Sequence, residues 1–178
     1  MIAITAATGQ LGHYVIESLM KTVPASQIVA IVRNPAKAQA LAALEHGVFI
    51  GAAGDGKIAS ATRADYAAAA ARVISEAGHE GKVYELAGDS AWTLTQLAAE
   101  LTKQSGKSVT YQNLSEADFA AALKSVGLPD GLADMLADSD VGASKGGLFD
   151  NSKTLSKLIG RPTTTLAESV SHLFNVNN

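Results

Sequence analysis

The sequence predicts an α/β fold that opens with two buried parallel strands joined by a helix. The first observation is a short apolar run with β-branched residues at 2–5, bounded by a glycine-bearing turn. The second is a helical spacing of apolar residues across 10–22, with Pro24 after its end. The third is another apolar run at 28–32. A strand, a helix and a second strand in this order are how a parallel sheet begins.

The rest of the chain alternates shorter elements. Asn34 and Pro35 supply an N-cap and a first-turn proline for a helix that reaches residue 44. Thr93 and Gln96 match a capping box, in which each side chain satisfies a free N–H group of the other residue. We expect strands at 48–50, 82–86 and 109–111, helices at 64–77, 94–105, 115–123 and 163–174, a short amphipathic piece at 132–136, and surface loops at 51–56 and 141–147.

Composition excludes several classes of protein. The chain has 178 residues, 47% of them hydrophobic, a net charge of −3 and no cysteine. One globular domain of ordinary size fits these values, whereas disulfides, thiol catalysis and binding to a nucleic-acid backbone do not. The four histidines are scattered, so we expect no metal site. Since there is no long apolar run and no signal peptide, we expect no membrane span and a cytoplasmic location.

The turn after the first strand has the pattern of a dinucleotide-binding loop. Gly9 and Gly12 occupy the second and third glycine positions of G-x-x-G-x-x-G, and Ala6 stands at the first. Glycine allows the positive φ of the tight bend and lets backbone N–H groups approach a pyrophosphate at the helix N-terminus. An ordinary strand–turn–helix is the alternative. The position of the turn between a strand and a helix favours the cofactor site.

Arg33 follows the second strand, 21 residues after Gly12. The residue about 20 positions after this loop reads the adenosine ribose of the cofactor. An acidic side chain there binds the 2′-hydroxyl of NAD, whereas an arginine pairs with the 2′-phosphate of NADP. A solvated charge at a strand end is the alternative interpretation, and the spacing favours NADP.

Other patterns have structural explanations that we prefer. The glycines of 51–56 resemble a phosphate cradle, but no Gly-Lys-Ser/Thr completes it, which favours a plain loop. Asp134, Asp138 and Asp140 lack the spacing of a calcium loop and are typical of a solvated acidic face. Trp92, just before the capping box, is more typical of a packing anchor than of a substrate platform. No Tyr-x-x-x-Lys and no persuasive Ser–His–Asp/Glu order occurs, so no catalytic residue is assigned.

The chain has too few strands for a complete domain of this kind. A dinucleotide-binding fold uses about six strands, and each β–α–β unit takes about 30 residues or more. Only two strands of the right buried character precede the change of pattern, so on the order of 100 residues of sheet are absent between Leu41 and Val48. We therefore expect an α/β chain with an incomplete NAD(P)-binding Rossmann-like parallel sheet in residues 1–43 and a small α/β C-terminal subdomain in residues 44–178.

Both parts resemble one known family. Residues 2–33, with Thr-Gly-Gln-Leu-Gly at 8–12, are similar to the opening of the NmrA-like atypical short-chain dehydrogenase/reductases. Residues 63–66, 83–89 and 93–101 look like the C-terminal substrate-binding subdomain of the same family. The resemblance covers almost the whole chain in two blocks.

The resemblance implies a cofactor, a substrate and a reaction. It implies hydride transfer from NADPH to a quinone, in which the nicotinamide ring carries the chemistry and the protein supplies orientation. It also implies that residues 48–178 form one wall of the substrate cleft. The backbone of residues 6–11 would hold the pyrophosphate, and Arg33 would read the 2′-phosphate. The implied cofactor-binding residues are Ala6, Ala7, Thr8, Gly9, Gln10, Leu11, Gly12 and Arg33.

Three functions remain open from the sequence. The first is an NADPH-dependent quinone reductase, for which a partner chain in a homo-oligomer could complete the sheet. The second is a non-catalytic NADP-binding sensor or regulator, a role that the same family also fills. The third is an inactive, internally deleted chain, in which an exposed strand edge at 28–32 would favour association. NADPH consumption with a quinone separates the first from the others, and NADP binding without turnover separates the second from the third.

Overall fold

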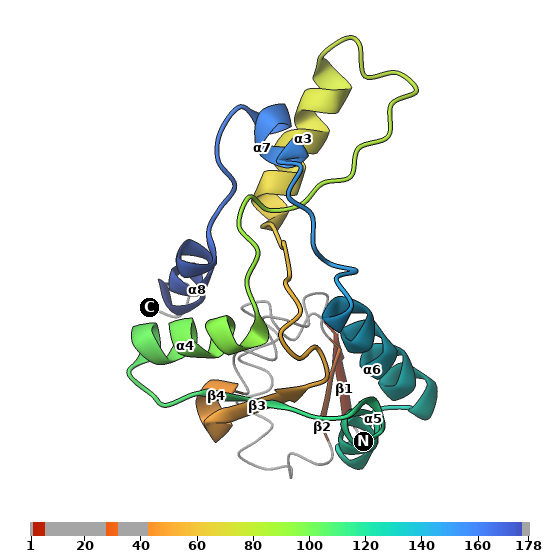
Figure 1. Cartoon of the computed structure of the whole chain (residues 1–178), viewed down its shortest axis with the longest axis vertical. Helices are drawn as coiled ribbons and strands as arrows, with labels where there is room; N and C mark the ends of the chain where they lie inside the picture. The colour runs from red at the N-terminus through yellow and green to blue at the C-terminus, as the bar shows by residue number, and fades with distance from the viewer. Residues whose placement is uncertain (1, 6–27, 32–42, 176–178) are drawn as a thin grey trace.

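The computed structural model describes residues 2–5, 28–31 and 43–175 (Figure 1). Strand β1 (Ile2–Thr5) pairs in parallel with β2 (Ile28–Ile31). The register places Ile2 opposite Ile28 and Thr5 opposite Ile31. Both strands therefore end at the same edge of their sheet, and the two predicted opening strands and their parallel pairing are confirmed.

A second parallel pair joins β3 (Val48–Gly51) to β4 (Thr110–Asn113). Gly51 lies opposite Asn113, so these strands also end at a common edge. Phe49 is buried, and its ring centroid lies 5.2 Å from that of Tyr111 on β4. Parallel strands need a long crossover connection, which here contains helices α3 (Arg63–Ser75) and α4 (Leu94–Ser105).

Helix α4 is the centre of the larger hydrophobic core. Thr93 and Gln96 form the predicted capping box, and Gly106 ends the helix in the left-handed conformation at φ 71°. Its apolar face packs toward β3, β4 and α8 (Leu166–Asn175), as the layers in Figure 1 show. The buried members of this core are Ala43, Phe49, Ala53, Leu94, Leu97, Ala98, Leu101, Val109, Ala143 and Val170.

Helices α5 (Glu116–Ser125) and α6 (Asp130–Ser144) pack against each other beside this core (Figure 1). Their contact carries a smaller buried cluster of Ala52, Phe119, Ala120 and Ala137. Because the buried positions of α6 are alanines, its backbone lies close to its neighbours. The close approach of α6 limits the size of the side chains that fit at the end of β3 and in the loop after it.

Helix α3 packs against α7 (Thr154–Ile159), and Figure 1 shows the two helices together at the end of the molecule away from β3 and β4. The α3 N-terminus has a capping box of its own, made by Thr62 and Asp65. The helix ends at Ser75, two residues before the predicted end.

Three expectations for single elements were wrong. Residues 82–86 form no strand, because no described strand lies beside them, and Val83 is 92% exposed. The predicted piece at 132–136 is part of the longer helix α6, which continues to Ser144 through the first part of the expected 141–147 loop. Burial of Ala143 holds Gly142 in helical conformation despite its weak propensity.

Helix α7 was not expected, because its start carries no sequence signal. Its N-cap is Lys153, which has a left-handed backbone at φ 56° and makes no side-chain cap hydrogen bond. The fully buried Leu155 anchors this short helix instead.

Candidate functional site

The predicted cofactor-binding residues lie outside the residues that the structure describes. These are Ala6, Ala7, Thr8, Gly9, Gln10, Leu11, Gly12 and Arg33. The structure describes the strands that precede them. The pairing of Thr5 with Ile31 brings the end of β1 and the end of β2 to the same edge, which is where ligands bind in open parallel sheets.

Within the described residues, polar groups gather at the matching edge of the β3–β4 sheet. The loop that follows β3 is held by two side chains from other elements. Oδ2 of Asp140 on α6 accepts a hydrogen bond from the Ala52 N–H at 2.8 Å. Oδ1 of Asn113, at the end of β4, accepts one from the Gly54 N–H at 2.8 Å and another from the Tyr111 hydroxyl at 2.9 Å.

Two positions in this segment require glycine for lack of space. A Cβ on Gly51 would lie 2.7 Å from Asp140 Oδ2 and 3.2 Å from Tyr111 Cε2. A Cβ on Gly56 would overlap the backbone carbonyl of Ala143 on α6. Gly51 and Gly56 therefore let helix α6 approach. This supports the plain-loop interpretation over a phosphate cradle.

The electrostatics of this edge favour neutral forms. Burial raises the pKa of the Asp140 carboxyl above its ordinary value, and the hydrogen bond from Ala52 offsets only part of that effect. Burial also raises the pKa of Tyr111. The expectation of a solvated acidic face was wrong for Asp140, which is half-buried, whereas Asp138 is exposed and Asp134 forms a partly exposed ion pair with Lys124 at 2.7 Å.

Trp92 packs as predicted. Its side chain is half-buried against the larger core, and its Nε1–H donates to Ser60 Oγ at 3.1 Å. Its backbone pairs with that of Ile58 in an isolated antiparallel bridge. Trp92 thus fixes the chain between the 51–56 loop and α3.

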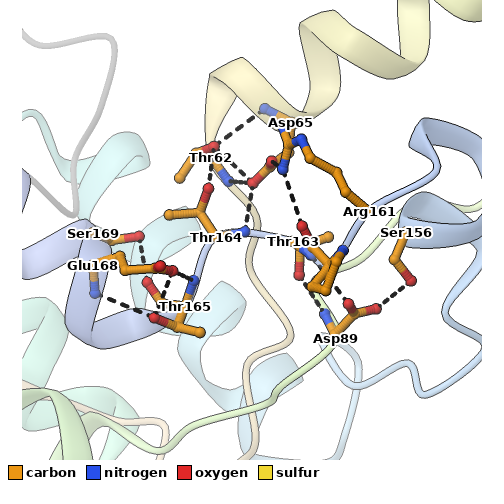
Figure 2. Close-up of polar contacts among 11 residues, drawn as sticks. Thr62, Asp65, Asp89, Ser156, Arg161, Thr163, Thr164, Thr165, Glu168 and Ser169 are labelled. Carbon is orange, nitrogen blue, oxygen red and sulfur yellow. Dashed lines mark hydrogen bonds and ion pairs between the residues drawn. The ribbon is translucent and has the colours of Figure 1, made fainter.

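A second polar group joins α3 to the segment between α7 and α8 (Figure 2). The Asp65 side chain is fully buried. Its Oδ2 accepts hydrogen bonds from Thr62 Oγ1 at 2.8 Å and the Thr164 N–H at 3.0 Å, and its Oδ1 lies 2.7 Å from Nη1 of Arg161. Burial raises the pKa of Asp65, but these three partners outweigh it and bring the pKa down to about 2.

Asp89 makes a similar tie beside it (Figure 2). The Asp89 N–H donates to Thr163 Oγ1 at 2.8 Å, and the Thr163 N–H donates back to Asp89 Oδ2 at 3.1 Å. Ser156 of α7 donates its hydroxyl to Asp89 Oδ1 at 2.6 Å. These bonds connect residues more than 60 positions apart in the sequence, and their role is to hold the fold together.

An open pocket of about 290 Å³ lies along this segment. It offers Arg161 and His172 beside the carboxylate of Glu168, which is already engaged by the Thr165 N–H and hydroxyl. The pocket thus carries side chains of both charges, and its carboxylate is occupied by hydrogen bonds to Thr165, so we assign no catalytic group to it. The lining residues are Arg161, Pro162, Thr163, Thr164, Thr165, Glu168 and His172.

The described part of the chain has neither a metal cluster nor a membrane-spanning helix. There, no group of three or more His, Asp or Glu side chains is placed to hold a metal ion. None of the helices described is both long enough and apolar enough to cross a membrane.

Comparison with known proteins identifies the family. No family model matches the chain. However, it is 61% identical to quinone oxidoreductase 2 of Escherichia coli over an alignment of 286 residues that covers 100% of both proteins. The chain belongs to the quinone oxidoreductase 2 family. It is also 31% identical to an NAD(P)H azoreductase of Xenophilus azovorans over 124 residues, which are 70% of this chain and 43% of that protein.

Solved structures agree with this assignment. The NADPH-dependent quinone oxidoreductase of E. coli matches with a TM-score of 0.75 and 61% identity over 98% of this chain and 100% of the other. The structure of the same enzyme complexed with NADPH matches with a TM-score of 0.74 and 60% identity, over the same shares of both chains. A Citrobacter triphenylmethane reductase complexed with NADP(H) matches with a TM-score of 0.70 and 26% identity. The match covers 97% of this chain and 100% of that reductase. The α/β class with a Rossmann-like sheet and the resemblance to NmrA-like short-chain reductases are thereby confirmed.

The alignment also explains the shortage of strands. It is 286 positions long and spans both proteins from end to end, whereas this chain has 178 residues, so at least 108 of its positions have no residue of this chain. Since both ends are matched, these positions are internal. Directly after the expected joint, Ala43 is fully buried and its carbonyl accepts the Gly47 N–H at 2.8 Å.

The sequence did not predict the polar side chains that hold distant segments of the described part together. Asp65 had a local signal, since Thr-x-x-Asp at 62–65 has capping-box spacing. Arg161, Asn113 and Asp140 had none, because the partners of Asp140 and Arg161 are 88 and 96 positions away in the sequence.

Proposed function

We propose that this chain is an NADPH-dependent quinone oxidoreductase that transfers a hydride from NADPH to a quinone. The observation that carries the proposal is the 61% identity to quinone oxidoreductase 2 along the whole chain, together with the match to that enzyme complexed with NADPH. When bound, the nicotinamide ring supplies the hydride. The protein binds and orients the two reactants.

The cofactor site is proposed at the carboxyl edge of β1 and β2. The chain leaves both strands at that edge, and the glycine-bearing sequence of residues 6–12 follows directly after Thr5. Backbone N–H groups of that turn would bind the pyrophosphate. Arg33 follows the end of β2 by two residues and would pair with the 2′-phosphate.

The division of labour along the chain is part of the proposal. Residues 1–43 would supply the cofactor side and residues 44–178 the substrate side. The parallel β3–β4 pair supports this division, because it places a second carboxyl edge, with polar side chains, in the C-terminal part. No catalytic residue is assigned.

A calorimetric titration of the purified chain with NADPH tests the cofactor site. We expect micromolar binding, weaker binding of NADH, and at least about tenfold weaker NADPH binding by Arg33→Ala, since a charge-assisted pair contributes about 1.5–3 kcal/mol. Arg63→Ala removes an exposed arginine elsewhere and should bind NADPH as the parent chain does. A folded chain that releases no heat with NADPH would contradict the proposal.

A second function is favoured by one observation. The internal absence of at least 108 aligned positions removes more than a third of the relative's length, which supports a non-catalytic NADP-binding regulator. NADPH oxidation with p-benzoquinone separates the two: turnover by the purified chain supports the reductase, whereas NADPH binding without turnover supports the regulator.

A further inference from the structure

An exposed aromatic ring lies in the turn that follows helix α6. Phe149 is 47% exposed, and its neighbour Leu148 is 53% exposed. The other three phenylalanines of the chain are better covered, since Phe49 and Phe119 are buried and Phe174 is half-buried. Phe149 is also absent from both buried clusters. Its ring therefore has a face that the fold leaves open.

The turn that carries this ring is held by its backbone. The Gly147 N–H donates to the Gly142 carbonyl at 3.0 Å, and a Cβ on Gly147 would lie 2.9 Å from that oxygen. From the opposite side, the Ala59 N–H donates to the Leu148 carbonyl at 2.9 Å. These hydrogen bonds fix the position of the turn although the Phe149 ring is not packed in the core.

Lys57 reaches the ring from the segment that leaves β3. Gly56, just before it, packs against the backbone of Ala143 near the end of α6. The Lys57 Nζ lies 5.9 Å from the centroid of the Phe149 ring, at the outer limit of about 6 Å for a cation–π contact. Within the described residues, no carboxylate forms an ion pair with Lys57, and its side chain is exposed. An open ring face and an unpaired cation thus lie side by side.

This pair of groups matches the chemistry of a quinone. A quinone is a planar, electron-poor ring with carbonyl oxygens at its edge. An aromatic side chain stacks against such a ring, and an ammonium group donates a hydrogen bond to a carbonyl oxygen. A simple anion would leave Phe149 without a role, and an aliphatic ligand would leave Lys57 without one.

We propose that Phe149 and Lys57 form a binding site for the quinone ring. Phe149 stacks against the ring, and the Lys57 ammonium donates a hydrogen bond to one of the carbonyl oxygens. This inference rests on the proposed function and names residues of the C-terminal part that contact the substrate. Both residues bind the quinone, and the hydride still comes from the nicotinamide.

Equilibrium dialysis of the purified chain with duroquinone (tetramethyl-p-benzoquinone) tests this site. The methyl groups of this probe block its ring carbons against addition of lysine amines. Phe149→Ala should raise the Kd for duroquinone about tenfold, because the stacking surface is lost. Lys57→Met should raise it about fivefold, because the hydrogen bond is lost. Phe149→Tyr keeps the ring and Lys57→Arg keeps the charge, so both should bind as the parent chain does.

Two control variants remove exposed side chains elsewhere. Val83→Ala and Lys82→Ala should leave the Kd for duroquinone unchanged. Phe149→Leu keeps an apolar side chain without the ring and repeats the comparison if Phe149→Ala does not fold. An unchanged Kd in both Phe149→Ala and Phe149→Leu, or an equal rise in Val83→Ala, would overturn the site. Self-association that depends on Phe149, without duroquinone binding, would assign this surface to a contact between copies and also overturn it.

NADPH oxidation with duroquinone separates this inference from the proposed function. A higher KM for duroquinone in Phe149→Ala, with an unchanged Kd for NADPH, would support both. Binding that depends on Phe149 and Lys57, without oxidation of NADPH, would overturn the reductase and leave the site. Oxidation with the same KM in the parent chain and in Phe149→Ala would do the reverse. Neither binding nor oxidation by the parent chain would overturn both.

Discussion

Asp65 determines how the α3–α7 end of the molecule responds to acid. Its carboxylate is fully buried, and hydrogen bonds from Thr62 and Thr164 and the Arg161 guanidinium outweigh the cost of burial. Together they lower the pKa from 3.8 to about 2. This charge therefore stabilises the folded chain while it remains ionised.

The predicted pH dependence follows from the direction of that shift. Because the folded pKa is the lower one, the stabilisation is complete above about pH 4 and is lost as the pH falls through about 2. The loss amounts to about 2 kcal/mol. Urea unfolding of the parent chain and Asp65→Asn across this pH range measures it. The difference between the two unfolding free energies should shrink toward low pH, and a constant difference would refute the assignment.

At the scale of an element, α4 is the part of the fold that the sequence predicts best. Its capping box, its apolar spacing and its terminal glycine lie within 14 consecutive residues, from Thr93 to Gly106, and all three are confirmed. Local signals of this kind depend on backbone groups of the helix itself, so no knowledge of distant contacts is needed.

Loss of the cap should weaken this helix measurably. Thr93→Ala removes the acceptor for the Gln96 N–H, and we expect the free energy of unfolding to fall by about 1 kcal/mol. Thr95→Ala, an exposed position in the same turn, should change it by less than about 0.5 kcal/mol. Chemical denaturation of both variants checks this, and equal effects would show that the cap contributes nothing specific.

Other elements were mispredicted where distant contacts outweigh local preference. Residues 82–86 were expected to form a strand, but no described strand lies beside them, so they stay irregular. Helix α6 continues through Gly142 because Ala143 is buried against the loop of residues 51–56. For α6 the deciding neighbour is far away in the sequence, and for residues 82–86 the missing neighbour decides.

At the scale of the whole molecule, the described residues contain two parallel strand pairs, each with its own carboxyl edge. The chain lacks at least 108 internal positions of its relative. A two-stranded sheet is marginal on its own, so its stability depends on the helices and ligands around it. Ligand binding should therefore have a visible effect on unfolding.

NADPH should stabilise the whole chain by mass action. At a concentration 100 times its Kd, we expect the free energy of unfolding to rise by about 2.7 kcal/mol. NADH at the same concentration should give a smaller rise, and Arg33→Ala should lose most of the NADPH effect. Thermal denaturation with each nucleotide measures this. Equal stabilisation by NADPH in the parent chain and in Arg33→Ala would contradict the role of Arg33.

The sequence by itself determined the class of this protein, its opening strands, the caps of α4 and the internal shortage of strands, because these depend on local patterns and on chain length. The tertiary structure decided which polar side chains act together. Asp140 meets Ala52, and Arg161 meets Asp65, across 88 and 96 positions of sequence. Such pairs form only when packing brings distant elements into contact, and nothing in the local sequence records that approach.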